Sequence, residues 1–158
     1  MHAEMINISG LPHMASHIML DEEEKFKKFL ILLSEEIKSR KKKFALCSAQ
    51  NFTVYNEIAE EKLAAIVILI DNFDAIREMD IEMESYFTKV TRDGVGLGIY
   101  FIATAGRSNS IRSATLNNFK NKIAGVNFDG NEARSLVGKC VYSLPDVIGR
   151  SIVKEDDR

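Results

Sequence analysis

The sequence predicts an α/β fold, a three-layer sandwich in which helices cover a mostly parallel central sheet. Apolar, β-branched runs of strand length alternate along the chain with segments whose apolar residues recur at helical spacing. The runs are continuously apolar, which is typical of parallel strands that are buried on both faces. With 158 residues, 46% hydrophobic and 28% charged, the chain has the size and composition of one globular domain.

The first half of the chain predicts two helices and one strand. A helix is expected over 21–43, because apolar residues recur every three or four positions and lysines gather at its C-terminal end. Asp21 is predicted to cap this helix, with Glu24 at the capping-box spacing. A shorter helix is expected over 54–61. The run IVILI at 66–70 then predicts a buried strand.

The second half continues the alternation, which favours right-handed crossovers and a parallel sheet. We expect helices over 83–90, 108–120 and 132–137, and strands over 99–104, 122–128 and 148–153. In the helix over 108–120, the residues predicted to point inward are Ile111, Leu116 and Phe119. The glycines at 94, 96 and 98 predict a flexible connection into the second strand.

Charge and cysteine content exclude several classes of protein. The net charge of −2 and the pI near 6.0 give no overall electrostatic reason to bind nucleic acid. Cys47 and Cys140 lie far apart without metal-site spacing, so we expect two free buried thiols. The sequence has no apolar run of about eighteen residues, and residues 1–10 do not resemble a secretory signal. The chain itself is therefore expected to be cytoplasmic.

The segment Ile66–Phe73 carries the most informative chemical signal. Its apolar run ends in Asp71, which is the pattern of a Walker B strand. Such a strand delivers a carboxylate to the carboxyl edge of a sheet, where it can hold the water shell of a nucleotide-bound Mg²⁺. Asn72 stands where hydrolytic enzymes of this kind usually carry a second acid, and an amide is a poor general base near neutral pH. Alternatively, Asp71 only caps the turn after a core strand, and the motif alone does not decide between the two.

The sequence contains no phosphate-binding loop to accompany this strand. The glycines at 94, 96 and 98 are followed by a predicted strand and not by a helix, so they do not form the G-x-x-x-x-G-K-[ST] motif. Without backbone amides gathered around a phosphate, tight ATP binding by this chain is not expected.

Three other patterns are weaker candidates for a site. His13 and His17 lie four residues apart, with Asp21 nearby, but Pro12 disturbs any helix there and two ligands make a poor metal site. The run Lys41–Lys43 could contact phosphates, although such runs are typically solvated helix ends. The two nearby serines, Ser110 and Ser113, show no catalytic-triad spacing.

The order of these segments resembles the FtsK/SpoIIIE family of motor ATPases, from about Leu11 to Lys154. The likeness includes Leu11-Pro12-His13, the helix over Phe26–Arg40, Asn56-Glu57, the strand ending in Asp71-Asn72-Phe73, and RDGVGLGIYFIATAGR. In that last stretch the residues at family positions are Arg92, Gly94, Gly98, Ile99, Ala103, Thr104 and Arg107. Two further segments, NNFKNKIAG and LPDVIGRSIVK, are most similar to the C-terminal ATPase domains of type VII secretion (EssC-type) proteins.

The resemblance implies a partial RecA-like P-loop NTPase fold that lacks its Walker A half. Residues 1–10 would be an N-terminal extension or an added segment, 11–154 the C-terminal part of an FtsK/SpoIIIE-like ATPase domain, and 155–158 a polar tail.

The resemblance also implies a nucleotide site, of which parts are altered. In the parent protein, ATP and Mg²⁺ would bind near Asp71, Thr104 and Arg107, with Asp71 holding the metal through water. Here Asn72 replaces the catalytic glutamate and Ala105 replaces the family's sensor glutamine. No catalytic residue set is therefore intact, and the chain alone is expected to hold no cofactor and to be inactive, although its parent would be an ATPase.

The function implied is that of a degenerate, non-hydrolysing ATPase-domain fragment of a type VII secretion motor. It would act in substrate engagement or in regulation of protein export, in the cytoplasmic part of a membrane-anchored parent. Its expected partners are neighbouring ATPase domains of the same chain or ring, and small helical secreted substrates. One alternative is a fragment of a DNA translocase, with DNA as its partner. A second alternative is an α/β protein-interaction module that binds no nucleotide.

Overall fold

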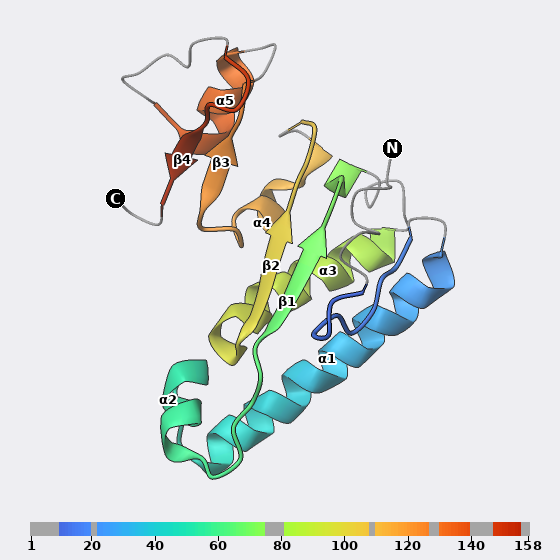
Figure 1. Cartoon of the computed structure of the whole chain (residues 1–158), viewed down its shortest axis with the longest axis vertical. Helices are drawn as coiled ribbons and strands as arrows, with labels where there is room; N and C mark the ends of the chain where they lie inside the picture. The colour runs from blue at the N-terminus through green and yellow to red at the C-terminus, as the bar shows by residue number, and fades with distance from the viewer. Residues whose placement is uncertain are drawn as a thin grey trace.

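The computed structural model describes residues 10–19, 22–74, 81–107, 110–126, 130–139 and 147–155 (Figure 1). In chain order the elements are α1 (Glu23–Leu46), α2 (Phe52–Ile58), β1 (Ile66–Ile70), α3 (Ile81–Gly94), the 3-10 turn η3 (Val95–Leu97), β2 (Ile99–Ala103), α4 (Ser113–Leu116), β3 (Lys122–Ala124), α5 (Gly130–Val137) and β4 (Ile152–Lys154). The strands β1 and β2 form a parallel pair, and β3 and β4 form a separate antiparallel pair. The α/β class is therefore confirmed, with a small parallel sheet.

The core lies between α1, α3 and one face of the β1–β2 sheet. Helix α1 buries one stripe along its length, formed by Leu30, Leu33, Ile37 and Phe44. Phe87 on α3 contacts Phe73 and Phe101, with ring centroids 5.2 and 5.6 Å apart. In Figure 1, α3 passes behind the two strands, and β3, β4 and α5 gather at the opposite end of the molecule from α2.

Arg40 is a buried charged residue that connects α1 to the start of both strands. Its guanidinium donates hydrogen bonds to the carbonyls of Leu97 and Ala64, at 2.8 and 2.9 Å, and its Nε donates to Oε1 of Glu36 at 2.6 Å. The same group lies over the ring of Phe52, 5.9 Å from its centroid. Since Leu97 and Ala64 lie two residues before β2 and β1, one side chain fixes both strand entries against α1.

The glycines before β2 lie in a tight turn that leads into the strand, as the predicted connection and strand entry require. Helix α3 continues into η3, and Gly98 then reverses the chain with a left-handed φ of +76°. The carbonyl of Gly98 accepts a hydrogen bond from the N–H of Ile66 at 2.9 Å, which extends the ladder between the strands. The turn therefore requires glycine at position 98, because φ is left-handed there and a Cβ would overlap the Phe52 ring.

The prediction of strands buried on both faces is wrong for the sheet of this chain. Inward-facing residues of β1 and β2 pack into the core, but the alternate residues Val67, Leu69, Tyr100 and Ile102 are exposed. The full three-layer sandwich is therefore not formed by the described residues. An apolar run indicates the burial that a strand requires, but it does not say that the same chain supplies both covering layers.

The predicted helix over 108–120 is also too long. Within the described part of this range, only Ser113–Leu116 is α-helical, and the fully buried side chain is Thr115 rather than Leu116. The Thr115 hydroxyl lies 2.6 Å from that of Thr88 on α3, and Asn118 donates to both Thr91 Oγ1 and the Thr88 carbonyl at 2.9 Å. These polar contacts hold the segment against α3, while Ile111, one of the three residues predicted to point inward, packs against the core as expected, and Leu116 and Phe119 are partly buried.

The remaining predicted boundaries differ in smaller ways. Helix α1 starts at Glu23 with Glu22 as its N-cap residue, α2 is capped by the Asn51 side chain, and α3 extends beyond 83–90 at both ends. The strands over 122–128 and 148–153 are shorter, and they pair antiparallel rather than joining a parallel sheet. Asp21, residues 108–109, residues 127–128 and Cys140 lie outside the described residues.

Cys47 is exposed, so the prediction that it is buried is wrong. Among the helices of the described ranges, none combines the length and the apolar character needed to cross a bilayer.

Candidate functional site

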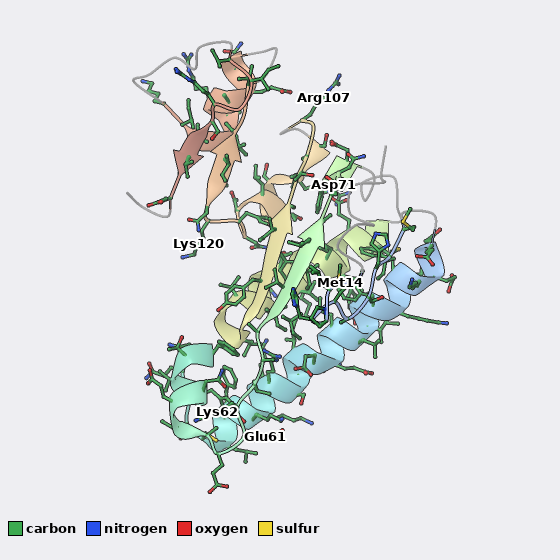
Figure 2. All side chains as sticks on the ribbon, viewed as in Figure 1. Met14, Glu61, Lys62, Asp71, Arg107 and Lys120 are labelled. Atoms are coloured by element: carbon green, nitrogen blue, oxygen red, sulfur yellow. The ribbon has the colours of Figure 1, made fainter. Side chains whose placement is uncertain are left out.

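The carboxyl edge of the parallel pair brings together Asp71 and Thr104. The strands are in register from Ile66 opposite Ile99 to Ile70 opposite Ala103, so the next residues of the two strands are neighbours. The Thr104 N–H donates to the Ile70 carbonyl at 2.9 Å, and its hydroxyl donates to Oδ1 of Asp71 at 2.7 Å. Both side chains are exposed. Asp71 thus lies at the sheet edge where ligands bind in open α/β folds, at the end of β1 in Figure 2.

Asn72 adopts a left-handed conformation directly after this aspartate, with φ +60°. Asparagine tolerates this region better than most residues, because its short side chain avoids much of the steric cost. The Asn72 N–H donates to Thr104 Oγ1 at 3.0 Å, and the Phe73 N–H donates to the Thr104 carbonyl at 2.8 Å. The Phe73 ring is 1% exposed and anchors the turn in the core. Thr104 therefore bonds three consecutive residues of the loop after β1.

Asp74 is a site residue that the sequence reasoning missed. Its Oδ2 accepts a hydrogen bond from the Gly106 N–H at 2.7 Å, so it fastens the loop after β2 to the loop after β1. Partial burial raises the pKa of Asp74. Hydrogen bonds from the Ser110 side chain and the Gly106 N–H lower the pKa by more than burial raises it, so the pKa lies below its ordinary value of 3.8. The available signal was the second acid three residues after Asp71 in DNFD.

Replacing Asp74 with asparagine is expected to cost about 0.5–1 kcal/mol of unfolding free energy at neutral pH, because a charge-assisted hydrogen bond becomes a neutral one. The folded-state pKa is depressed, so this stabilisation is present above pH 3.8 and is lost as the pH falls through the folded value. Urea denaturation of both proteins between about pH 7 and about pH 3 should show the deficit shrinking in acid. The exposed Glu35→Gln variant is the control, and a deficit independent of pH would contradict the prediction.

Arg107 is placed near this edge but is not brought to Asp71. In Figure 2 its side chain projects away from Asp71, and its carbonyl accepts a hydrogen bond from the N–H of Ser110 at 3.3 Å. Of the predicted cofactor-binding residues, the structure therefore joins Asp71 with Thr104, whereas the Arg107 side chain points away from Asp71.

The weaker candidates gain no support as sites. In the part of the chain that the structure describes, no three His, Cys, Asp or Glu side chains gather as a metal site would require. The carbonyl of His17 accepts a hydrogen bond from Lys25, at 2.7 Å. Two lysines of the basic run form ion pairs, Lys41 with Asp93 at 2.9 Å and Lys43 with Glu61 at 3.6 Å.

Sequence comparison finds relatives over nearly the whole chain. It is 36% identical over 156 residues to the ESX secretion system protein EccC of Geobacillus thermodenitrificans, and 38% identical over 153 residues to the ESX secretion system protein YukB of Bacillus subtilis. These matches include 99% and 97% of this chain, which spans about a tenth of each relative's length. No family model matches the sequence.

Comparison with solved structures finds the same group of secretion proteins. A structure of EssC ATPases 2 and 3 from G. thermodenitrificans matches with a TM-score of 0.93 and 36% identity, over 99% of this chain and 30% of that one. The cytoplasmic domain of EssC matches with a TM-score of 0.83 and 35% identity, over 100% and 31% of the two chains. The conjugation coupling protein TcpA, solved with ATPγS, shares the fold with a TM-score of 0.69 at 21% identity, over 88% of this chain and 42% of its own.

Identity above 30% along almost the entire chain, together with a superposable fold, identifies common ancestry. The chain is homologous to a segment of the ATPase domains of the EssC, EccC and YukB type VII secretion proteins.

Proposed function

We propose that this chain is a non-hydrolysing ATPase-domain segment of a type VII secretion motor, which engages substrates or regulates neighbouring ATPase domains in protein export. The observation that carries the proposal is the residue after the Walker B aspartate. Asn72 offers an amide where hydrolysis requires a group that can position water and accept a proton.

The local backbone supports this proposal. At φ +60°, a longer acidic side chain in place of Asn72 would be strained, so this turn is suited to the asparagine that it contains. The nearest acid along the loop, Asp74, bonds the Gly106 N–H instead of lying beside Asp71. The Asp71 oxygen that faces β2 already accepts the hydroxyl of Thr104. At the described part of the edge, the residue directly after Asp71 is therefore an amide, and the second carboxylate, that of Asp74, is bonded to the Gly106 N–H.

The expected metal and nucleotide chemistry depends on this same edge. In a complete domain Asp71 would hold Mg²⁺ through its water shell, and Thr104 would orient the Asp71 carboxylate. The fit is partial, because a carboxylate and a hydroxyl are suitable oxygen ligands, but the chain contains no phosphate-loop motif. We therefore propose that this chain holds no ATP on its own.

The proposed partners and location follow from the homologues. Neighbouring ATPase domains are the first candidates, because a solved relative is named for two such domains in one chain. Small helical secreted proteins are the proposed substrates. A cytoplasmic position within a membrane-anchored parent is proposed, since the solved region of one homologue is its cytoplasmic domain.

The two alternative functions have less support. The relatives at 30% identity or more are secretion proteins by name, whereas the coupling protein TcpA shares the fold alone. A DNA track would require free cations, and Lys41 and Lys43 are already paired with acids. Homology to ATPase domains disfavours an interaction module of unrelated ancestry.

The purified chain is expected to show no binding of ATP with Mg²⁺ up to about millimolar nucleotide in isothermal titration, and no phosphate release, because a lone carboxylate supplies too few contacts for a triphosphate. TcpA, which was solved with ATPγS, serves as the positive control. Asn72→Glu is expected to remain inactive. Micromolar affinity that Asp71→Asn abolishes, accompanied by turnover, would overturn the proposed function.

A further inference from the structure

Helix α1 carries two apolar side chains on the face that it turns away from the core. Ile31 and Leu32 are 53% and 64% exposed, whereas Leu30 and Leu33 on either side of them are buried. In Figure 1, α1 runs along the outside of the molecule, with α3 and the β1–β2 pair on its inner side. The outer side of α1 therefore has an apolar centre that the described part of the chain leaves open to water.

Opposite charges flank this apolar pair symmetrically. Lys28 lies three residues before Ile31, Glu35 lies three residues after Leu32, and both charged side chains are exposed. Residues three and four positions apart are neighbours on a helix surface, so these four side chains form one continuous strip. Lys28, Ile31, Leu32 and Glu35 are termed the α1 outer face. Along the chain, this face is basic, then apolar, then acidic.

The two charges of the α1 outer face are not satisfied by this chain. Neither Lys28 nor Glu35 forms an ion pair with any residue that the structure describes. The neighbouring Lys27, by contrast, pairs with Glu23 one turn earlier, at 2.8 Å. Lys28 and Glu35 are two helical turns apart, about 10 Å along the axis, so they do not meet each other. Their charges are instead complementary to those of a second helix that carries the same pattern in the opposite direction.

A second copy of α1 has that pattern. If two antiparallel α1 helices are aligned on their apolar pairs, Ile31 of each copy lies beside Leu32 of the other. The same alignment places Lys28 of each copy opposite Glu35 of the other, because both lie three residues from the apolar pair. One two-fold axis thus covers four apolar side chains and forms two equivalent ion pairs. A parallel alignment would instead place lysine against lysine and glutamate against glutamate.

The two ends of α1 favour the same direction. The first turn carries Glu23 and Glu24, and the exposed side towards the C-terminal end carries Lys38 and Lys42. In an antiparallel pair, the acidic start of each helix lies nearest the basic end of the other, and the two helix dipoles attract each other. In a parallel pair, like charges would face each other along the whole length. Charge complementarity therefore points to a second copy in the antiparallel orientation.

We propose that two copies of this chain associate through the α1 outer face, as an antiparallel helix pair with a two-fold axis between Ile31 and Leu32. The surface is small, so the association is weak and transient. The proposal goes beyond the proposed function, because it requires no nucleotide and uses no residue of the sheet edge that carries Asp71.

Charge reversal at positions 28 and 35 tests this pairing by analytical ultracentrifugation. Lys28→Glu turns both ion pairs of the dimer into repulsions between carboxylates, so we expect self-association to weaken by about tenfold or more. Glu35→Lys should weaken it to a similar extent, through repulsions between lysines. Lys139→Glu makes the same change of charge at an exposed residue after α5, and this matched control should leave the association unchanged.

Two combinations of these variants should restore the association. In an equimolar mixture of Lys28→Glu and Glu35→Lys chains, each acid of one chain again lies opposite a lysine of the other. The double variant Lys28→Glu/Glu35→Lys exchanges the two charges without changing the number of ion pairs. Both samples should associate about as tightly as the original chain, which separates loss of pairing from loss of folding.

The original chain is expected to be partly dimeric at about 100 µM and to dissociate as salt is raised, because exposed ion pairs are screened. A monomer at every concentration would overturn the proposal. A dimer that Lys28→Glu leaves intact would also overturn it, since the contact would then lie on another surface. The readout is molar mass without nucleotide, so it is independent of the titration that tests the proposed function.

Discussion

Replacing Gly98 with alanine is expected to lower the free energy of unfolding by about 2–4 kcal/mol, one of the two largest effects predicted for a single substitution in this chain. Two costs add. The residue has φ +76°, where an L side chain is strained, and its Cβ would lie 2.5 and 2.6 Å from Cγ and Cε2 of Phe52. The Phe52 ring cannot withdraw freely, because the Arg40 guanidinium lies over it.

Gly96→Ala is the matched control for this prediction. Gly96 lies two residues earlier in the same turn, and a Cβ there would meet no atom within 4 Å. We expect its unfolding free energy to remain within about 0.5 kcal/mol of the original chain or to rise slightly, since alanine restricts the unfolded state. Urea denaturation followed by circular dichroism measures both variants. Equal stability of the two would show that the turn before β2 is adaptable.

Replacing Arg40 with methionine is expected to destabilise the chain by about 2–4 kcal/mol. Methionine retains the apolar length of the side chain but leaves the carbonyls of Ala64 and Leu97 without their guanidinium donor. Buried acceptors without partners carry the cost of desolvation. The lost ion pair with Glu36 contributes less, because the Glu36 side chain is 38% exposed and water screens it.

Lys42→Met on the same helix separates this effect from loss of charge alone. Lys42 is exposed, so its substitution should change stability by less than about 0.5 kcal/mol. Hydrogen exchange gives an independent readout, because loosening of the strand entries should increase exchange at the amides of Ile66 and Gly98. If Arg40→Met retained full stability, water would have to satisfy the carbonyls of Ala64 and Leu97 as well as the guanidinium does.

The sequence predicted the kinds of element well, because apolar periodicity reflects burial directly. The strands over 66–70 and 99–104 and the helix along α1 agree with the structure to within a few residues. Several failures occurred where side-chain hydrogen bonds or long-range packing decide the structure. Thr115 is fully buried through hydroxyl bonding, which no apolar pattern reveals, and Gly98 is fixed by long-range contact with Phe52.

The candidate site could be predicted only in part, for a similar reason. The carboxyl-edge position of Asp71 follows from strand polarity, and the neighbouring position of Thr104 follows from the register of two parallel strands. Asp74 acts through a bond between two loops, and loop–loop contacts have no periodicity to read. The resemblance placed Arg107 near the nucleotide, yet its direction depends on the loop conformation, which sequence alone does not give.

The contact between α3 and α4 has a consequence for the geometry of the C-terminal elements. Its components are directional: the paired hydroxyls of Thr88 and Thr115, the Asn118 amide, and an ion pair of 2.8 Å between Arg112 and the buried Glu84. Apolar surfaces can slide over one another with little penalty, whereas hydrogen bonds lose energy when their angles change. The direction in which the chain leaves α4 towards β3 is thus fixed by the angles of these hydrogen bonds rather than by the packing of apolar side chains.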